Sequence, residues 1–240
     1  MSTVVPVMRP FIQMLWAAVT SQPAGKEKTF KNGRWISRAR IQTPLTWLKA
    51  FSKLRLTSLP RLFLAAEPLY SPTVAFDAST TGGGAWLLCD GTAENPERYL
   101  AVTWTADDEK LLGTLRGDPA SQAIWEAYAM VLALATWMPF LPKGRCKLEL
   151  RGDAQGVLQS VLARRAKCPQ INKIIAETQL ILGSTMYDLY AAHVWSEHND
   201  VADCLSRLDE GAQVPDECAK ATRDEVIRPV WAFLGSPYVD

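Results

Sequence analysis

Long hydrophobic runs are missing from this chain of 240 residues. No apolar stretch approaches the roughly 20 residues that a membrane-spanning helix requires, so we expect no membrane partner. The first 20 residues are fairly apolar, but Pro6, Arg9 and Pro10 interrupt them, which makes a signal peptide a weak interpretation. Because 48% of the residues are hydrophobic and 21% are charged, the composition is typical of a globular protein and argues against disorder.

Paired cysteines are lacking as well. The chain has an odd number of cysteines, and no two of them have the CxxC spacing of a zinc or redox motif: Cys89, Cys146, Cys168, Cys204 and Cys218. We therefore expect reduced thiols, no zinc site and an intracellular location. The sequence does not distinguish the cytoplasm from the nucleus.

Acidic residues are scarce in the first 70 residues. That stretch has eleven Lys or Arg against two Glu, a net charge of +9, and the total of +1 leaves −8 for the rest. The contrast predicts a basic, mostly helical segment over 1–69, a main domain over 70–210 and a tail over 211–240. A basic arm beside an acidic domain suits a protein that handles a polyanion, although solvated protein faces also produce such asymmetry.

The main domain has the pattern of an α/β fold. We expect strands at 74–78, 84–89, 98–105, 146–151 and 187–195, and helices at 118–137, 154–166, 170–184 and from 200. Short loops between the first three strands indicate antiparallel pairing, whereas the last two strands arrive through helical crossovers. These elements predict a mixed five-stranded sheet with flanking helices.

Four carboxylates lie at the ends or starts of these elements. Asp77 ends the first strand, Glu126 lies in an alanine-rich helix, Asp153 follows the fourth strand, and Asp203 follows the fifth. Acids in such places can converge on one sheet edge, where they repel one another unless a divalent cation lies between them. The pattern therefore predicts a magnesium-dependent site that cleaves phosphodiesters.

Two motifs resemble a known family. Phe76-Asp-Ala-Ser, followed by Gly82-Gly-Gly-Ala-Trp-Leu, resembles the first hairpin of a retroelement ribonuclease H domain. The stretch from His193 to Arg207, which ends in Ala-Asp-Cys-Leu-Ser-Arg, is very similar to the closing motif of gypsy-type and DIRS-type elements. The resemblance covers about residues 70–208, and the segment 1–69 faintly resembles the thumb or connection region that precedes ribonuclease H in reverse transcriptases.

The resemblance implies a ribonuclease H-like fold and an endonuclease that cuts the RNA strand of an RNA–DNA hybrid. It implies two Mg²⁺ ions, with Mn²⁺ as a possible substitute, held by Asp77, Glu126, Asp153 and Asp203. It also implies a histidine that relays a proton during product release, a role that suits His198, although His193 aligns better with the family's histidine. Residues expected to contact the hybrid are Ala78, Ser79 and Gln122. The chain has no recognisable polymerase palm, so a polymerase domain is a possible partner.

Other interpretations stay open at this point. Asp77 could only terminate a strand, Asp153 could only cap a helix, and Asp203 could be an exposed acid favoured by a helix dipole. For Asn199 we expect a role as the N-cap of the last helix. The domain could also be a catalytically decayed module that only binds nucleic acid, or another nuclease of the same superfold.

Overall fold

The mixed sheet of the main domain has six strands. The computed structural model describes residues 9–20, 41–49 except 43 and 47, 71–89, 97–141, 145–183, 185–231 and 234. Its strands are β1 (Thr73–Ala78), β2 (Gly82–Leu88), β3 (Arg98–Thr103), β4 (Arg145–Gly152), β5 (Met186–His193) and β6 (Thr222–Arg223). They are arranged in the order β5-β4-β1-β2-β3-β6.

The strand directions confirm the expected fold class, an α/β fold in which three antiparallel strands are extended by strands added through helical crossovers. β1, β2 and β3 form an antiparallel meander, and β4 and β5 add to its β1 side in parallel. The helical crossovers before and after β4 account for the parallel pairing, because tight turns can join only antiparallel strands. β6 is an additional strand that the sequence did not predict, and it pairs in parallel with β3.

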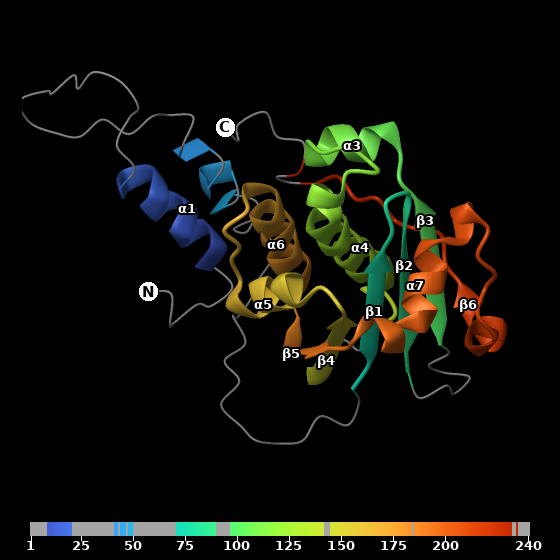
Figure 1. The fold of residues 1–240 in the computed structure, drawn as a ribbon. Coiled ribbons are helices and arrows are strands. Elements are labelled where there is room, and N and C mark those ends of the chain that lie inside the picture. Colours follow the sequence, from blue (N-terminus) through green and yellow to red (C-terminus); the bar gives the residue numbers. More distant parts are fainter. Residues whose placement is uncertain are drawn as a thin grey trace, which may run out of the picture.

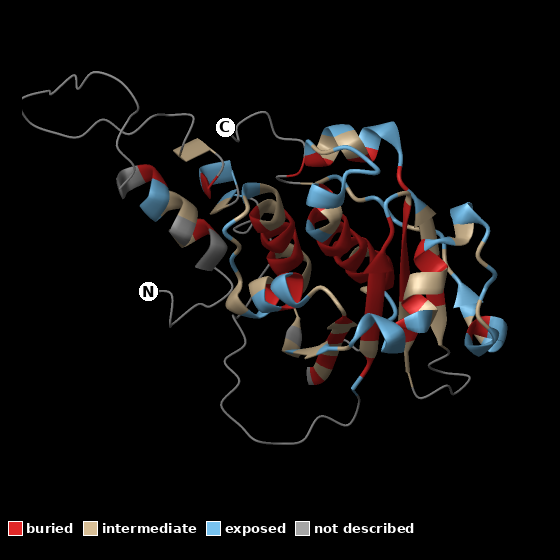
Figure 2. Ribbon diagram, in the orientation of Figure 1, coloured by how far each residue is buried: buried red, intermediate tan, exposed pale blue. Residues whose placement is uncertain are grey.

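Helices cover both faces of the sheet (Figure 1). α4 (Gln122–Trp137) packs on β1 and β2, and α5 (Gln155–Ala163) and α6 (Pro169–Leu182) lie beside it. α7 (Asp200–Ser206) packs on the opposite face, against β1, β2 and β3. Figure 2 shows that α4 is buried along nearly its whole length, which explains why apolar residues occur all round it.

One unpredicted helix and one helix boundary differ from the prediction for local reasons. The unpredicted helix is α3 (Ala106–Leu112), whose sequence is short and rich in acids. A capping box starts it, in which the side chain of Thr105 accepts from the backbone of Asp108 and the Asp108 side chain accepts from the Thr105 backbone. α5 ends at Ala163 instead of residue 166 because Arg164 adopts a left-handed conformation with φ of 54°.

The main core lies between the sheet and α4. Trp104, Trp125 and Trp137 are all fully buried there, as expected for core residues. The ring of Trp104 stacks on Trp125 with centroids 5.0 Å apart, and Tyr128 lies against both. Such close aromatic packing fixes the orientation of α4 on the sheet.

The C-terminal segment is attached to the main domain. Beyond β6, Asp224 accepts a hydrogen bond of 2.6 Å from Nη1 of Arg98 on β3 and one of 2.9 Å from the indole N–H of Trp137 on α4. Part of the predicted tail is therefore integral to the fold.

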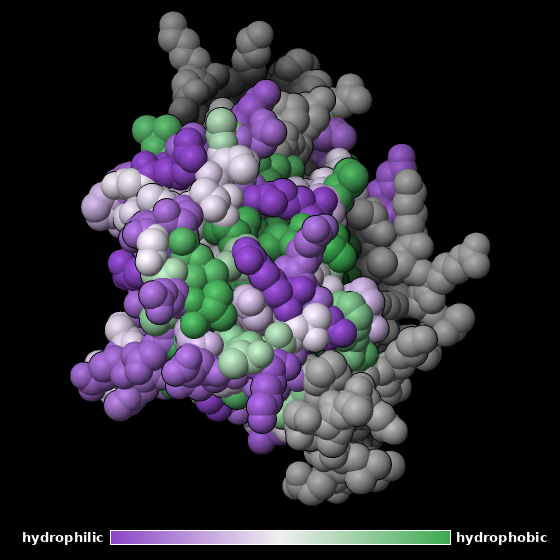
Figure 3. Space-filling model, turned by 90° about the vertical axis from the view of Figure 1, so that its right-hand side faces the viewer, coloured by the Kyte–Doolittle hydropathy of each residue, from purple (hydrophilic) through white to green (hydrophobic). Residues whose placement is uncertain are grey.

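Figure 3 looks onto the face that carries α7 and β6, where hydrophilic residues dominate the rim and hydrophobic residues gather toward the middle.

A buried carboxylate anchors the same segment further along. Asp108, which is 2% exposed, accepts hydrogen bonds from the guanidinium of Arg228 and from the hydroxyl groups of Tyr128 and Thr105. Burial raises the pKa of Asp108, but these hydrogen bonds outweigh it and the net shift is downward. The ionised carboxylate therefore ties the C-terminal segment to α3 and α4.

At the other end of the chain, α1 (Arg9–Thr20) packs against α6, and its residues Phe11 and Ala18 are buried. Residues 41–42, 44–46 and 48–49 are also helical. The rest of the predicted segment 1–69 lies outside the described residues. Among the described residues, no helix is long and apolar enough to cross a bilayer.

Candidate active site

Three of the four predicted carboxylates meet at one edge of the sheet. β1 and β4 are parallel neighbours, and two residues beyond the pair Ala75–Arg151 the chain reaches Asp77 on one side and Asp153 on the other. Glu126 comes from the second turn of α4, which packs on β1. One oxygen from each of the three carboxylates lies within 4.8 Å of the other two. We call Asp77, Glu126 and Asp153 the carboxylate cluster.

Asp77 is buried, with 5% of its surface exposed. Its Oδ2 accepts a hydrogen bond of 2.9 Å from the hydroxyl of Ser206 on α7. The pKa of Asp77 is raised from 3.8 to about 7, chiefly by burial and also by the charges of Asp153 and Asp203, while the hydrogen bond from Ser206 and the charge of Arg207 act in the opposite direction. The ionised form is thus costly unless positive charge is supplied.

Glu126 is the second buried acid, and one of its oxygens has no hydrogen-bond partner. Oε1 accepts a hydrogen bond of 3.2 Å from Gln122, one turn earlier on α4, whereas the buried Oε2 accepts none. Burial, followed by the charges of Asp77 and Asp153, raises the pKa of Glu126 well above its usual value. An unpaired buried oxygen beside two other carboxylates fits a hard divalent cation, which prefers oxygen ligands.

Asp153 is the most accessible member of the cluster. It follows β4, and its Oδ2 accepts a hydrogen bond of 2.7 Å from the hydroxyl of Ser196, in the loop after β5. Ala154 takes the N-cap position of α5, and no side chain caps that helix. The alternative in which Asp153 serves only as a helix cap is therefore wrong.

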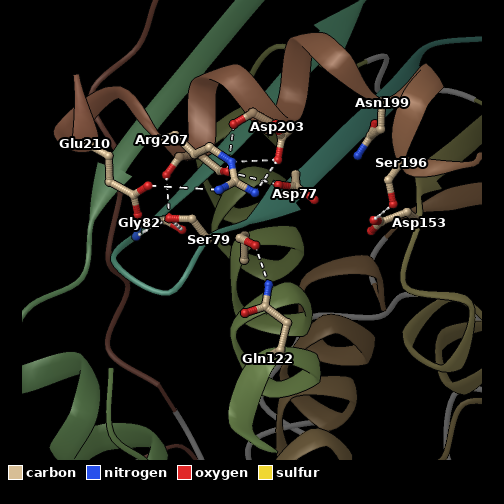
Figure 4. Close-up of polar contacts among 12 residues, drawn as sticks. Asp77, Ser79, Gly82, Gln122, Asp153, Ser196, Asn199, Asp203, Arg207 and Glu210 are labelled. Atoms are coloured by element: carbon tan, nitrogen blue, oxygen red, sulfur yellow. Dashed lines mark hydrogen bonds and ion pairs between the residues drawn. The ribbon is translucent and has the colours of Figure 1, made fainter. Parts of the chain in front are cut away.

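Asp203 stays outside the carboxylate cluster. Figure 4 shows its carboxylate facing Arg207, which directly follows α7. Nε of Arg207 donates to Oδ1 of Asp203 at 2.9 Å, and Nη2 lies 2.9 Å from the same oxygen as an ion pair. The charge of Asp203 still contributes to the raised pKa of Asp77. Its role as a metal ligand stays a prediction.

Asn199 occupies the expected N-cap position of α7, but the expectation that its side chain caps the helix is wrong, because that side chain makes no capping hydrogen bond. Instead, Nδ2 donates to the backbone oxygen of Phe76 at 3.2 Å, directly before Asp77. Asn199 therefore attaches the start of α7 to the end of β1.

Both histidines are exposed, His193 at the end of β5 and His198 between β5 and α7. His198 ends the short 3-10 helix Ser196–His198, which places it two residues beyond the serine that contacts Asp153. His193 ends β5, and its ring meets the exposed ring of Trp195 edge-on with centroids 5.3 Å apart. A proton relay by His198 stays a prediction.

The residues expected to contact substrate border the cluster. Gln122 donates both to the backbone oxygen of Ala78 and to Glu126. Ser79 is buried, and its hydroxyl donates to the backbone oxygen of Ser206 at 2.8 Å. In this conformation Ser79 joins the β1–β2 turn to α7, and its contact with substrate stays a prediction.

Two further features position the site and were missed in the sequence. Ser206 holds Asp77, and Ser196 holds Asp153. Gly84 on β2 lets α7 lie directly on the sheet, since a Cβ there would come within 2.4 Å of the backbone nitrogen of Ser206. The three consecutive glycines of β2 indicate in the sequence that another backbone lies close to this strand.

Comparisons with known proteins complete the description of the site. No family model matches the chain, and no curated protein matches it. One similar solved structure is ribonuclease H1 from Halobacterium salinarum NRC-1, which is 18% identical in sequence. The match covers 59% of this chain and 98% of the ribonuclease H1 chain, with a TM-score of 0.39. The N-terminal ribonuclease H domain of rv2228c from Mycobacterium tuberculosis has 14% identity, 60% and 95% coverage and a TM-score of 0.43.

A third similar structure is LC11-RNase H1, solved in complex with an RNA/DNA hybrid. It has 15% identity, covers 60% of this chain and 99% of that chain, and has a TM-score of 0.41.

Proposed function

We propose that this protein is a divalent-metal-dependent endonuclease that hydrolyses the RNA strand of RNA–DNA hybrids. The observation that carries the proposal is the carboxylate cluster, in which two of three converging acids are buried and one buried oxygen has no partner. Structural roles do not explain such an arrangement, because buried carboxylates with raised pKa values cost stability.

The residues of the cluster would hold the metal, with Mg²⁺ as the preferred ion and Mn²⁺ as a substitute. Bound there, divalent cations supply an activated water and stabilise the charge that develops on the phosphoryl oxygens. The protein's own task is to orient the ligands. Ser206 holds Asp77, Gln122 holds Glu126, and Ser196 holds Asp153, each through one hydrogen bond.

Hydrolysis of this kind forms a bond from the water oxygen to phosphorus and breaks the bond from phosphorus to the 3′ oxygen. The products are a 5′-phosphate and a 3′-hydroxyl. Selection of a hybrid depends on backbone shape and 2′-hydroxyl groups, because an A-like duplex hides its base edges from side chains. Gln122, at the border of the cluster, is the candidate contact for a 2′-hydroxyl group.

We further propose that the domain is the ribonuclease H part of a retroelement reverse transcriptase. The closing motif between His193 and Arg207 supports this origin. In the fold, the motif supplies the loop that contacts Asp153 and the helix that contacts Asp77. A polymerase domain would then be a functional partner.

A cleavage assay tests the proposal. The protein is incubated with an RNA–DNA hybrid labelled on either strand, with Mg²⁺ or with EDTA. We expect Mg²⁺-dependent cuts in the RNA strand only. Asp77→Asn and Asp153→Asn should abolish cleavage, because each replaces a charged ligand with a neutral amide of the same shape.

The matched control is Asp216→Asn, the same change at an exposed acid in a separate 3-10 helix, which should cleave at the wild-type rate. Hybrid binding without any cleavage by the wild-type protein would refute the proposal and favour a decayed binding module. Preferred cleavage of a DNA duplex would favour another nuclease of the same superfold.

A further inference from the structure

The ion pair between Asp203 and Arg207 lies at the border of the carboxylate cluster. Both guanidinium contacts go to one oxygen of Asp203, at 2.9 Å. The two side chains are 41% and 49% exposed, so solvent reaches the pair. Figure 4 shows the guanidinium on the same side of α7 as Asp77.

The charges of the pair act on Asp77. Asp203 raises the pKa of Asp77, and Arg207 lowers it, so both groups are close enough for their charges to be felt in the cluster. Ser206, between them in sequence, donates directly to Asp77. One turn of α7 therefore presents an anion and a cation to the same buried acid.

Arg207 also has a second anionic neighbour. Its Nη1 lies 4.0 Å from Oε2 of Glu210, and Oε1 of Glu210 accepts a hydrogen bond of 2.6 Å from the hydroxyl of Thr81. The β1–β2 turn thus holds Glu210 in place. If Arg207 releases Asp203, it keeps an ion-pair partner on the far side from the cluster.

From this geometry we infer that Arg207 is a positioning residue, which neutralises Asp203 beside the carboxylate cluster and competes with a divalent cation for it. The inference rests on the proposed function, since it takes the cluster to be a metal site. In the metal-free protein the guanidinium supplies the positive charge at this border. A cation that recruits Asp203 must displace Arg207, which then pairs with Glu210.

Metal affinity is the decisive measurement, because a purely structural ion pair would not affect it. Mn²⁺ is titrated into the full chain, and free Mn²⁺ is followed by electron paramagnetic resonance. Arg207→Gln should bind Mn²⁺ roughly three- to tenfold more tightly than the wild type, the effect of one partly screened unit charge near the site. Arg207→Lys keeps the charge and should stay within about twofold of the wild type.

The matched control is Arg223→Gln, which removes the same charge from the exposed strand β6 and should leave Mn²⁺ affinity unchanged. Unchanged affinity in Arg207→Gln would overturn the inference and reduce the pair to a local helix contact. Weaker affinity would also overturn it, because Arg207 would then orient Asp203 for the metal. A wild-type protein that binds no Mn²⁺ would overturn the proposed metal site and this inference together.

Discussion

Replacing Asp77 by asparagine should stabilise the metal-free protein while it removes the proposed activity. Asp77 has a pKa of about 7 in the folded protein, chiefly because it is buried, against 3.8 as its ordinary value. Below pH 3.8 the Asp77 carboxyl is protonated in both the folded and the unfolded protein, so its burial costs no stability. As the pH rises from 3.8 through the folded pKa of about 7, the unfolded chain ionises more readily than the folded protein, which must ionise a buried acid. The free energy of unfolding therefore falls by about 4 kcal/mol over that range.

Asparagine has the shape of the protonated acid and does not ionise, and its oxygen can still accept from Ser206. In EDTA at pH 8.5, urea unfolding followed by tryptophan fluorescence should show Asp77→Asn to be more stable than the wild type by about 2–4 kcal/mol. The gap should shrink below about 2 kcal/mol at pH 5, where the wild-type acid holds its proton. Added Mg²⁺ should also narrow the gap, since it stabilises only the wild type.

Asp203→Asn is the matched control, because this acid is partly exposed and already paired with Arg207. Its free energy of unfolding should change by no more than about 1 kcal/mol. The reasoning is refuted if Asp77→Asn is no more stable than the wild type at pH 8.5, or if its advantage is the same at pH 5.

Three further predictions concern packing and support of the site. Gly84→Ala should lower the free energy of unfolding, measured in urea, by about 2 kcal/mol or more, because the added Cβ would collide with the backbone of α7. The control Gly156→Ala, where a Cβ would meet open space, should raise the free energy of unfolding by roughly 0.5–1 kcal/mol. Arg228→Gln should cost roughly 1–3 kcal/mol at pH 7, because it leaves the buried carboxylate of Asp108 without its cation, and the difference should narrow as acid protonates that group, whose folded pKa is low. Ser196→Ala should weaken Mn²⁺ binding roughly tenfold with little change in melting temperature, because an exposed hydroxyl that holds one ligand is lost; equal affinity would exclude that role.

The sheet and the cluster could be predicted because both depend on short-range patterns. Alternating apolar residues and short turns fix the meander, and the parallel pairing of β1 with β4 follows from the helices between them. Once those two strands are neighbours, Asp77 and Asp153 must lie side by side. Glu126 was recognisable as an acid within an otherwise apolar helix.

The contacts of α7 could not be predicted because they are long-range. The hydrogen bond from Ser206 to Asp77 joins residues 129 positions apart, and the sequence alone gives no geometry for it. Asn199 looked like a helix cap, but a distant acceptor, the backbone oxygen of Phe76, takes its hydrogen bond. The pairing of β6 likewise depends on where the chain returns after a long connection.

The attachment of the C-terminal segment limits where a recombinant fragment can be cut. A fragment that stops at residue 210 would lose β6 and expose backbone groups of Arg98 and Tyr99 along the edge of β3. Exposed strand edges recruit other copies of the same chain, so such a fragment would be prone to aggregate during expression. Fragments for crystallisation should therefore extend at least to Leu234, whose backbone N–H still contacts Glu177 on α6.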